Sequence, residues 1–155
     1  MTTGYINRPL DPEREEIRFL YPNFSGPSDE PLDYRIEHVS LLHGINLVFN
    51  AISYTWEQSP KPTSTILLDG KLSYVPPSAE SALRGIANVA GQHSPSEQDV
   101  PIWIDAICIN QADVEEKSAQ LPLMSNIYSQ ATTVVIWLRG ADGQADDAFV
   151  WVESF

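Results

Sequence analysis

A chain of 155 residues with 43% hydrophobic residues has the size and composition of one domain with a single core. Its 9 basic and 21 acidic residues give a formal net charge of -12, which repels nucleic-acid phosphates and anionic lipid head groups, so we expect neither nucleic acid nor a membrane as a partner. One cysteine excludes an internal disulfide, and the absence of an N-terminal apolar signal and of any apolar run of about 18 residues predicts a cytoplasmic protein.

The N-terminal part of the chain predicts a flexible segment followed by the folded domain. Residues 1–16 are rich in charged residues and proline, so we expect them to be flexible. The folded domain is expected to span 17–155 and to belong to a longer protein. Its first apolar stretch, 17–21, predicts a strand at the edge of a sheet.

Three further segments before residue 76 have strand-like patterns. The stretches 34–40 and 47–56 are rich in β-branched and aromatic residues and predict two strands. Within 66–75, Asp69 and Gly70 separate two apolar runs, and both residues tolerate the positive φ angles of a tight turn. This segment therefore predicts a β-hairpin.

Helices and strands are expected to alternate in the rest of the chain. Apolar residues at helical spacing predict an amphipathic helix over 78–90, and buried strands are predicted at 102–109 and 132–138. The tail 146–155 resembles the start of another helix.

A further helix is predicted to begin near Asp113. Pro122 lies inside it and is expected to break or kink it, because proline lacks the amide donor and clashes with the preceding turn. One side of this helix is expected to face the core, with these apolar residues on it: Val114, Leu121, Met124, Ile127, Tyr128 and Ala131.

This alternation is typical of an α/β domain with a largely parallel sheet flanked by helices, here with an inserted hairpin. Functional residues of such sheets gather at the carboxyl ends of the strands. If the strands 47–56 and 102–109 are neighbours, Ser53, Trp56 and Asn110 are expected to line one cleft. The candidate ligand-binding residues at these two strand ends are Ser53, Tyr54, Trp56, Asn110, Gln111 and Asp113.

Several of these residues also have ordinary structural interpretations. Asp113 and Glu116 fit a capping box, in which Asp113 caps the helix and Glu116 accepts from the Asp113 amide. Asp105 is better explained as a carboxylate that accepts hydrogen bonds from neighbouring backbone N–H groups than as a group that transfers protons. Cys108 is better explained as a packing residue. No cysteine–histidine spacing typical of a metal site occurs.

The segments AISYTW, IWIDAICINQADVEEKSAQLPLMSNIYSQA and VVIWL make the chain resemble the fungal heterokaryon incompatibility (HET) domain. The order and spacing of these segments match the family signature. Glu57, Lys117 and Arg139 depart from it, where the family usually has Gly, Arg and Gly. The matching positions are Ser53, Tyr54, Trp56, Trp103, Ile104, Asp105, Cys108, Ile109, Asn110, Gln111, Asp113, Glu116, Gln120, Met124, Ile127, Tyr128, Ala131, Trp137 and Leu138.

The resemblance implies an effector of non-self recognition that triggers programmed cell death in fungi. It also implies an upstream sensor domain or protein as a partner. HET domains are distantly similar to Toll/interleukin-1 receptor (TIR) domains, which have a flavodoxin-like fold and either self-assemble or hydrolyse NAD. By that analogy Glu116 would be the catalytic glutamate.

Two hypotheses follow from the resemblance. In the first, NAD is a substrate, and no bound cofactor is expected. Glu116 would stabilise the oxocarbenium-like state of the reaction. Tyr54 or Trp56 would stack on a ring of NAD, and Asn110 or Ser53 would bind its ribose or amide groups. In the second, the domain is a non-enzymatic module that works by self-association into a homo-oligomer or by docking onto a partner.

Overall fold

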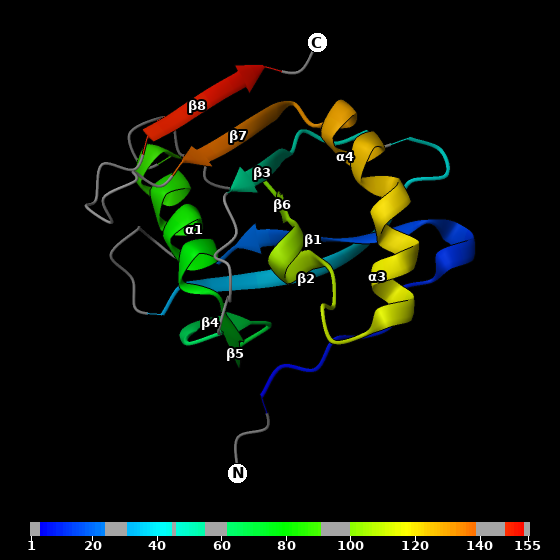
Figure 1. Cartoon of the computed structure of the whole chain (residues 1–155), viewed down its shortest axis with the longest axis horizontal. Coiled ribbons are helices and arrows are strands. Elements are labelled where there is room, and N and C mark those ends of the chain that lie inside the picture. Colours follow the sequence, from blue (N-terminus) through cyan, green and yellow to red (C-terminus); the bar gives the residue numbers. More distant parts are fainter. Residues whose placement is uncertain are drawn as a thin grey trace.

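The computed structural model describes residues 4–23, 31–44, 46–54, 62–90, 100–138 and 148–153. They form a sheet of eight strands with helices packed against it (Figure 1). The strands are β1 Glu16–Pro22, β2 Asp33–Ser40, β3 Asn50–Tyr54, β4 Ser64–Leu68, β5 Lys71–Val75, β6 Ile102–Ile104, β7 Thr133–Leu138 and β8 Ala148–Glu153. The helical elements are η1 Pro12–Arg14, α1 Pro77–Ala90, α2 Asp105–Cys108, α3 Val114–Gln120, η3 Leu121–Leu123 and α4 Met124–Gln130.

The sheet is mixed, with the order β5-β4-β2-β1-β6-β3-β7-β8. Parallel pairs join β3 to β6, β3 to β7 and β2 to β4. The pairs β1–β2, β1–β6, β4–β5 and β7–β8 are antiparallel. The predicted α/β class and the flanking helices are therefore confirmed, whereas the expectation of a largely parallel sheet is wrong.

Strand β1 lies in the middle of the sheet, between β2 and β6, and not at the predicted edge. Its residues Ile17, Arg18, Phe19 and Leu20 are all fully buried, so both faces of the strand are covered. Arg18 is buried against Glu116 of helix α3, which is distant in the chain.

The predicted strand 102–109 ends at Ile104, and Asp105–Cys108 forms the single helical turn α2. Within this turn the side chains of Ile107 and Cys108 are buried. A short apolar run fits a buried strand and a buried helical turn equally well, so its periodicity could not separate the two.

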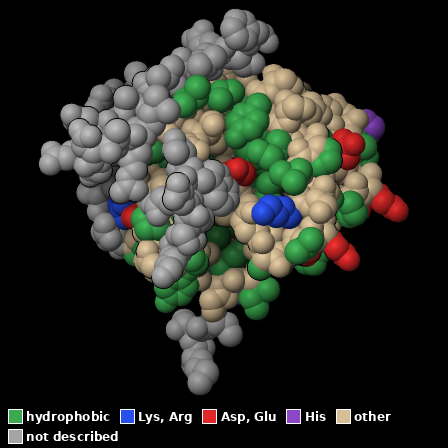
Figure 2. All heavy atoms as spheres, in the orientation of Figure 1, with side chains coloured by type: hydrophobic (Ala, Val, Ile, Leu, Met, Phe, Trp, Pro, Cys, Tyr) green, Lys and Arg blue, Asp and Glu red, His purple; other side chains and the backbone are tan. Residues whose placement is uncertain are grey.

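The predicted break at Pro122 is confirmed, because the 3-10 turn η3 separates α3 from α4 there. The expected inward face is confirmed for the second half of the predicted helix, where Ile127 and Ala131 are buried, and is wrong for the first half. Val114 and Leu121 are 76% and 53% exposed, whereas Gln120 is buried. In Figure 2 hydrophobic side chains are visible over the column formed by α3 and α4.

The predicted C-terminal helix is also wrong, since Ala148–Glu153 is the strand β8. It pairs antiparallel with β7, with Trp151 opposite Val135. The sequence AFVWVE is rich in β-branched and aromatic residues, which favour a strand when a neighbouring strand is available.

Helices lie against both faces of the sheet. Leu20 lies directly opposite Ile102, so these residues, and Arg18 two positions before Leu20, point to the same face. Trp103 points to the other face, where its ring meets Tyr128 of α4 edge-on, with centroids 5.6 Å apart. The predicted burial of Trp103 and Trp137 is confirmed.

Candidate functional site

The centre of the site is an ion pair between Arg18 of β1 and Glu116 of α3. Both terminal guanidinium nitrogens of Arg18 donate to the Glu116 carboxylate, Nη1 to Oε1 and Nη2 to Oε2, the latter over 3.1 Å. The Arg18 side chain is fully buried and that of Glu116 is 9% exposed. Two-point contact between planar groups fixes their relative orientation, so this pair locks α3 onto β1.

The same two side chains also organise three backbone segments. Arg18 donates from Nη1 to the Cys108 carbonyl over 3.0 Å and from Nη2 to the Arg8 carbonyl over 2.8 Å. Glu116 Oε1 accepts from the Asn110 amide over 2.9 Å. The N-terminal segment, the end of α2 and the loop before α3 are thus held by one buried ion pair.

Asp113 caps helix α3 as predicted, because its Oδ1 accepts from the amides of Glu115 and Glu116 over 3.1 and 3.2 Å. The other half of the predicted capping box is wrong. The Asp113 amide donates to the Asn110 carbonyl, and the Glu116 carboxylate turns inward to Arg18. A buried arginine is a stronger partner for a carboxylate than a neutral amide.

Replacing Asp113→Ala is expected to lower the free energy of unfolding by about 1 kcal/mol, the usual cost of losing a helix cap. Urea denaturation followed by circular dichroism measures this. The exposed neighbour Glu115→Ala serves as the control and should change stability by less than about 0.5 kcal/mol. Equal losses in the two variants would contradict the capping role.

Asn110 and Gln111 line a cleft of about 370 Å³ between the loop before α3, the N-terminal segment and β5. Its walls also include Tyr5, Asn7 and Tyr74. Gln111 Nε2 donates to the Asp105 carbonyl over 2.9 Å, and Asn110 Oδ1 accepts from the Ala112 amide over 3.2 Å. These bonds hold both amide side chains in the lining of the cleft.

Ser53 and Tyr54 lie at the carboxyl end of β3, which does neighbour β6 as expected. Tyr54 is buried and Ser53 is half-buried. Neither lines the cleft of Asn110 and Gln111, and Trp56 lies outside the described residues.

Ser53 belongs instead to a small polar group with Tyr128 and Asp105. The Tyr128 hydroxyl donates to the Ile52 carbonyl over 3.4 Å. Burial raises the pKa of Tyr128 to about 12, the Asp105 carboxylate adds to the rise, and a hydrogen bond with Ser53 opposes it. Tyr128 is therefore a neutral hydrogen-bonding group at neutral pH. Asp105, at the start of α2, is half-buried.

Cys108 is fully buried, and its thiol lies 3.5 Å from the Ile104 amide. Burial raises the pKa of this thiol to about 12, although the Ile104 amide and Arg18 act in the opposite direction. A thiol that stays protonated at neutral pH is a poor nucleophile. The placement fits a packing role.

We expect Cys108 to resist alkylation by iodoacetamide at pH 8 in the native protein and to react once urea unfolds the chain. The reason is that neither thiolate nor access is available in the folded state. Mass spectrometry follows the reaction without ambiguity, since Cys108 is the only cysteine of the chain. Rapid labelling of the native protein would show that the thiol is accessible.

Arg18 is the residue that the sequence analysis missed. It stands in the short apolar run IRFLY and is 98 residues away from Glu116. The one sign of this role in the sequence is a charged residue, Arg18, among apolar residues whose pattern predicts burial. A buried arginine requires a buried carboxylate, but many acidic residues of this chain were equally eligible partners.

Comparison with known proteins identifies the family. The family model described as "Heterokaryon incompatibility protein (HET)" matches residues 49–154, more than half of the chain. The chain belongs to the HET family. The resemblance noted from AISYTW, the segment around IWIDAICINQ and VVIWL is thereby confirmed.

A curated relative agrees with this assignment. The chain is 38% identical over 99 residues to heterokaryon incompatibility protein 6, OR allele, of Neurospora crassa. The match covers 59% of this chain but 14% of the relative, so the chain spans a small part of that protein's length. No solved structure matches the chain.

Among the described residues no helix is long and apolar enough to cross a membrane. No group of three or more histidine, cysteine, aspartate or glutamate side chains in that part of the chain is placed to hold a metal ion.

Proposed function

We propose that this HET domain triggers programmed cell death in the incompatibility response and does so by association through helix α3, not by catalysis at Glu116. The orientation of α3 supports the proposal. The helix turns its charged Glu116 inward onto Arg18, and Val114 at its start and Leu121, which follows it as the first residue of η3, are exposed. The inward side serves the fold, and the outward side is free to meet another protein.

The Glu116 carboxylate is poorly placed to serve a reaction in this conformation. Its two oxygens accept from Arg18 and from the Asn110 amide, and the side chain is almost fully buried. A carboxylate that stabilises an oxocarbenium-like state must lie beside the sugar ring. Glu116 would first have to leave Arg18, which would leave a fully buried guanidinium without its anion.

The outward side of α3 has the properties of an association surface. Val114 and Leu121 are seven residues apart, so they lie on the same side of the helix two turns apart. Exposed apolar side chains on one side of a helix commonly mark a protein interface. The occupant is either a second copy of the chain or the upstream sensor.

NAD hydrolysis is the second candidate, and the cleft beside Asn110 and Gln111 favours it. The cleft is lined by the loop before α3, and in this loop the Asn110 amide donates to the Glu116 carboxylate. Its amide side chains are suited to hydrogen-bond a ribose or carboxamide. The TIR-like mechanism requires Glu116 to move into this cleft after assembly.

Two pairs of substitutions separate the candidates. The variant Arg18→Met/Glu116→Gln removes both buried charges together, and its folding is checked by thermal unfolding. The variant Val114→Lys/Leu121→Lys alters the outer side of α3. Its matched control, Ser118→Lys/Ser125→Lys, adds the same charge at exposed polar positions of the same column.

Each variant is induced in fungal cells and scored for death, and the purified proteins are incubated with NAD while nicotinamide release is followed. We expect the folded charge-free variant to kill, the Val114/Leu121 variant to be inactive and its control to kill. Loss of killing and of nicotinamide release in the charge-free variant alone would establish the enzymatic route instead. Sedimentation of the wild type distinguishes self-association from docking onto a sensor.

A further inference from the structure

Residues 4–10, here called the strap, form neither a helix nor a strand, and they connect two parts of the domain. The Tyr5 amide donates to the Leu72 carbonyl of β5 over 2.8 Å, and the Arg8 carbonyl accepts from Arg18 Nη2 over 2.8 Å. In Figure 1 the strap, in dark blue, runs from the N-terminus past the loop before α3 toward β1. It therefore joins the edge strand of the sheet to the buried ion pair.

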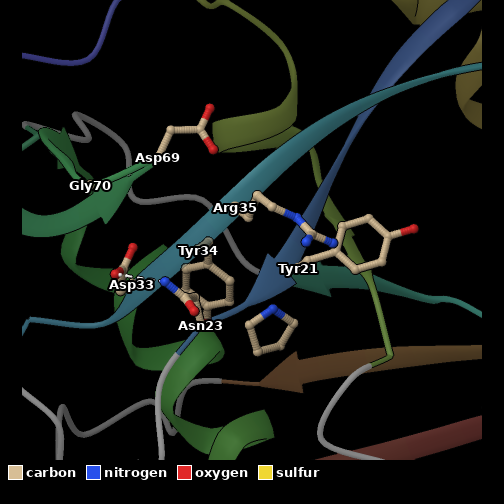
Figure 3. A pocket seen from close by; sticks show the side chains of 8 residues that line it. Tyr21, Asn23, Asp33, Tyr34, Arg35, Asp69 and Gly70 are labelled. Carbon is tan, nitrogen blue, oxygen red and sulfur yellow. Dashed lines mark hydrogen bonds between the residues drawn. The ribbon is translucent and has the colours of Figure 1, made fainter.

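The strand on which the strap lies is held in place independently of the strap. The β4–β5 turn is fixed against β2, because the Asp69 amide donates to the Tyr34 carbonyl and Asp69 Oδ1 accepts from the Ile36 amide, both over 2.9 Å. Figure 3 shows Asp69 and Gly70 of this turn beside Tyr34 of β2. Since β5 is anchored in this way, the strap can leave it without moving the sheet.

The strap also forms one wall of the cleft of about 370 Å³. Tyr5 and Asn7 line this cleft, whereas Arg18 and Glu116 do not. The Tyr5 ring is half-buried and packs against the core, and burial raises the pKa of its hydroxyl, with Arg18 acting in the opposite direction. Arg8, the neighbour of Asn7, contacts Arg18 directly. The strap thus lies between the cleft and the ion pair.

The strap is less deeply buried than the strand that follows it. Ile6 is 80% exposed and Arg8 is exposed as well, whereas residues 17–20 of β1 are fully buried. Segments with few buried side chains open at a lower free-energy cost than the core does. If the strap leaves, Arg18 keeps its bonds to Glu116. The strap can therefore open while the rest of the domain stays folded.

We propose that the strap is a releasable lid that is coupled through Arg18 to the loop before α3. With the strap in place, the pair of Arg18 and Glu116 is closed off from the cleft. Release of the strap lets water reach the pair, which weakens it, and the Asn110 amide, which donates to Glu116, is then held less firmly. A protein that binds the strap shifts the domain toward this open state. The lid does not depend on which proposed function holds, since α3 and the cleft both adjoin the ion pair.

Amide hydrogen exchange of the ¹⁵N-labelled domain, measured over a series of low urea concentrations, tests the proposal. The Tyr5 amide reports on the strap and the Asn110 amide on the loop before α3. The Ala51 amide reports on unfolding of the whole domain, because Ala51 is fully buried in β3, which lies between β6 and β7. Tyr5→Ala removes the ring that holds the strap, and Ile6→Ala is the matched control at the exposed neighbouring position.

In the wild type we expect the Tyr5 and Asn110 amides to share one opening, about tenfold or more less protected than Ala51 and nearly independent of urea, because that opening exposes little surface. Tyr5→Ala should lower the protection of Asn110 about tenfold, and Ile6→Ala should leave it unchanged. Equal protection of Asn110 and Ala51 in the wild type would overturn the lid, and this comparison decides even if Tyr5→Ala unfolds. Protection of Asn110 that Tyr5→Ala leaves unchanged would also overturn it. The readout involves neither killing nor NAD, so its result is separate from the tests of the proposed function.

Discussion

Arg18→Met is expected to lower the free energy of unfolding by about 3–5 kcal/mol, the typical cost of breaking a buried ion pair from one side. The substitution nearly preserves volume but leaves the Glu116 carboxylate, 9% exposed, without its cation. It also removes the donors to the carbonyls of Cys108 and Arg8. Urea denaturation at neutral pH, followed by circular dichroism, measures the loss.

A double-mutant cycle separates the pair from the volume of the two side chains. Glu116→Gln alone should also be strongly destabilising, because it leaves Arg18 charged and fully buried. Arg18→Met/Glu116→Gln should recover most of the stability, since no buried charge remains and the glutamine oxygen can still accept from Asn110. Additive losses in the double variant would mean that the two residues do not act as a pair.

Trp103→Ala is the second large effect, with an expected loss of about 3–5 kcal/mol in the free energy of unfolding. Trp103 is fully buried in β6 and meets the Tyr128 ring edge-on. Truncation removes a large apolar surface and leaves a cavity between the sheet and α4. The measurement is again urea denaturation at equilibrium.

The matched control for Trp103 is Tyr74→Ala, another aromatic residue on a strand. Tyr74 is 63% exposed on β5, so its truncation should change stability by less than about 0.5 kcal/mol. Similar losses for the two residues would mean that Trp103 is less tightly packed than its burial indicates.

The elements with strong local signals were predictable from the sequence. Residues 71–75 and 133–138 are strands, 77–90 is a helix, and the chain kinks at Pro122. In each case the local pattern and the tertiary environment favour the same conformation. The family was predictable for a similar reason, because its signature lies in short contiguous segments around Trp103 and Asp113.

Elements whose local pattern fits two conformations were decided by their neighbours. Ile102–Ile109 divides into strand and helical turn, and Ala148–Glu153 is a strand because β7 offers an open edge. The central position of β1 likewise depends on pairing with β2 and β6. Such pairing joins residues far apart in the chain, which a local pattern does not record.

For the site, the sequence by itself determined that polar residues follow Ile109 and that Asp113 caps a helix. It left two roles open for Glu116: accepting a hydrogen bond from the Asp113 amide at the start of its own helix, or serving as a catalytic glutamate. The tertiary structure gave Glu116 a third role, as the partner of Arg18. The physical reason is that β1 buries the Arg18 guanidinium where α3 brings the Glu116 carboxylate, and burial makes that pairing stronger than a local bond to a backbone amide.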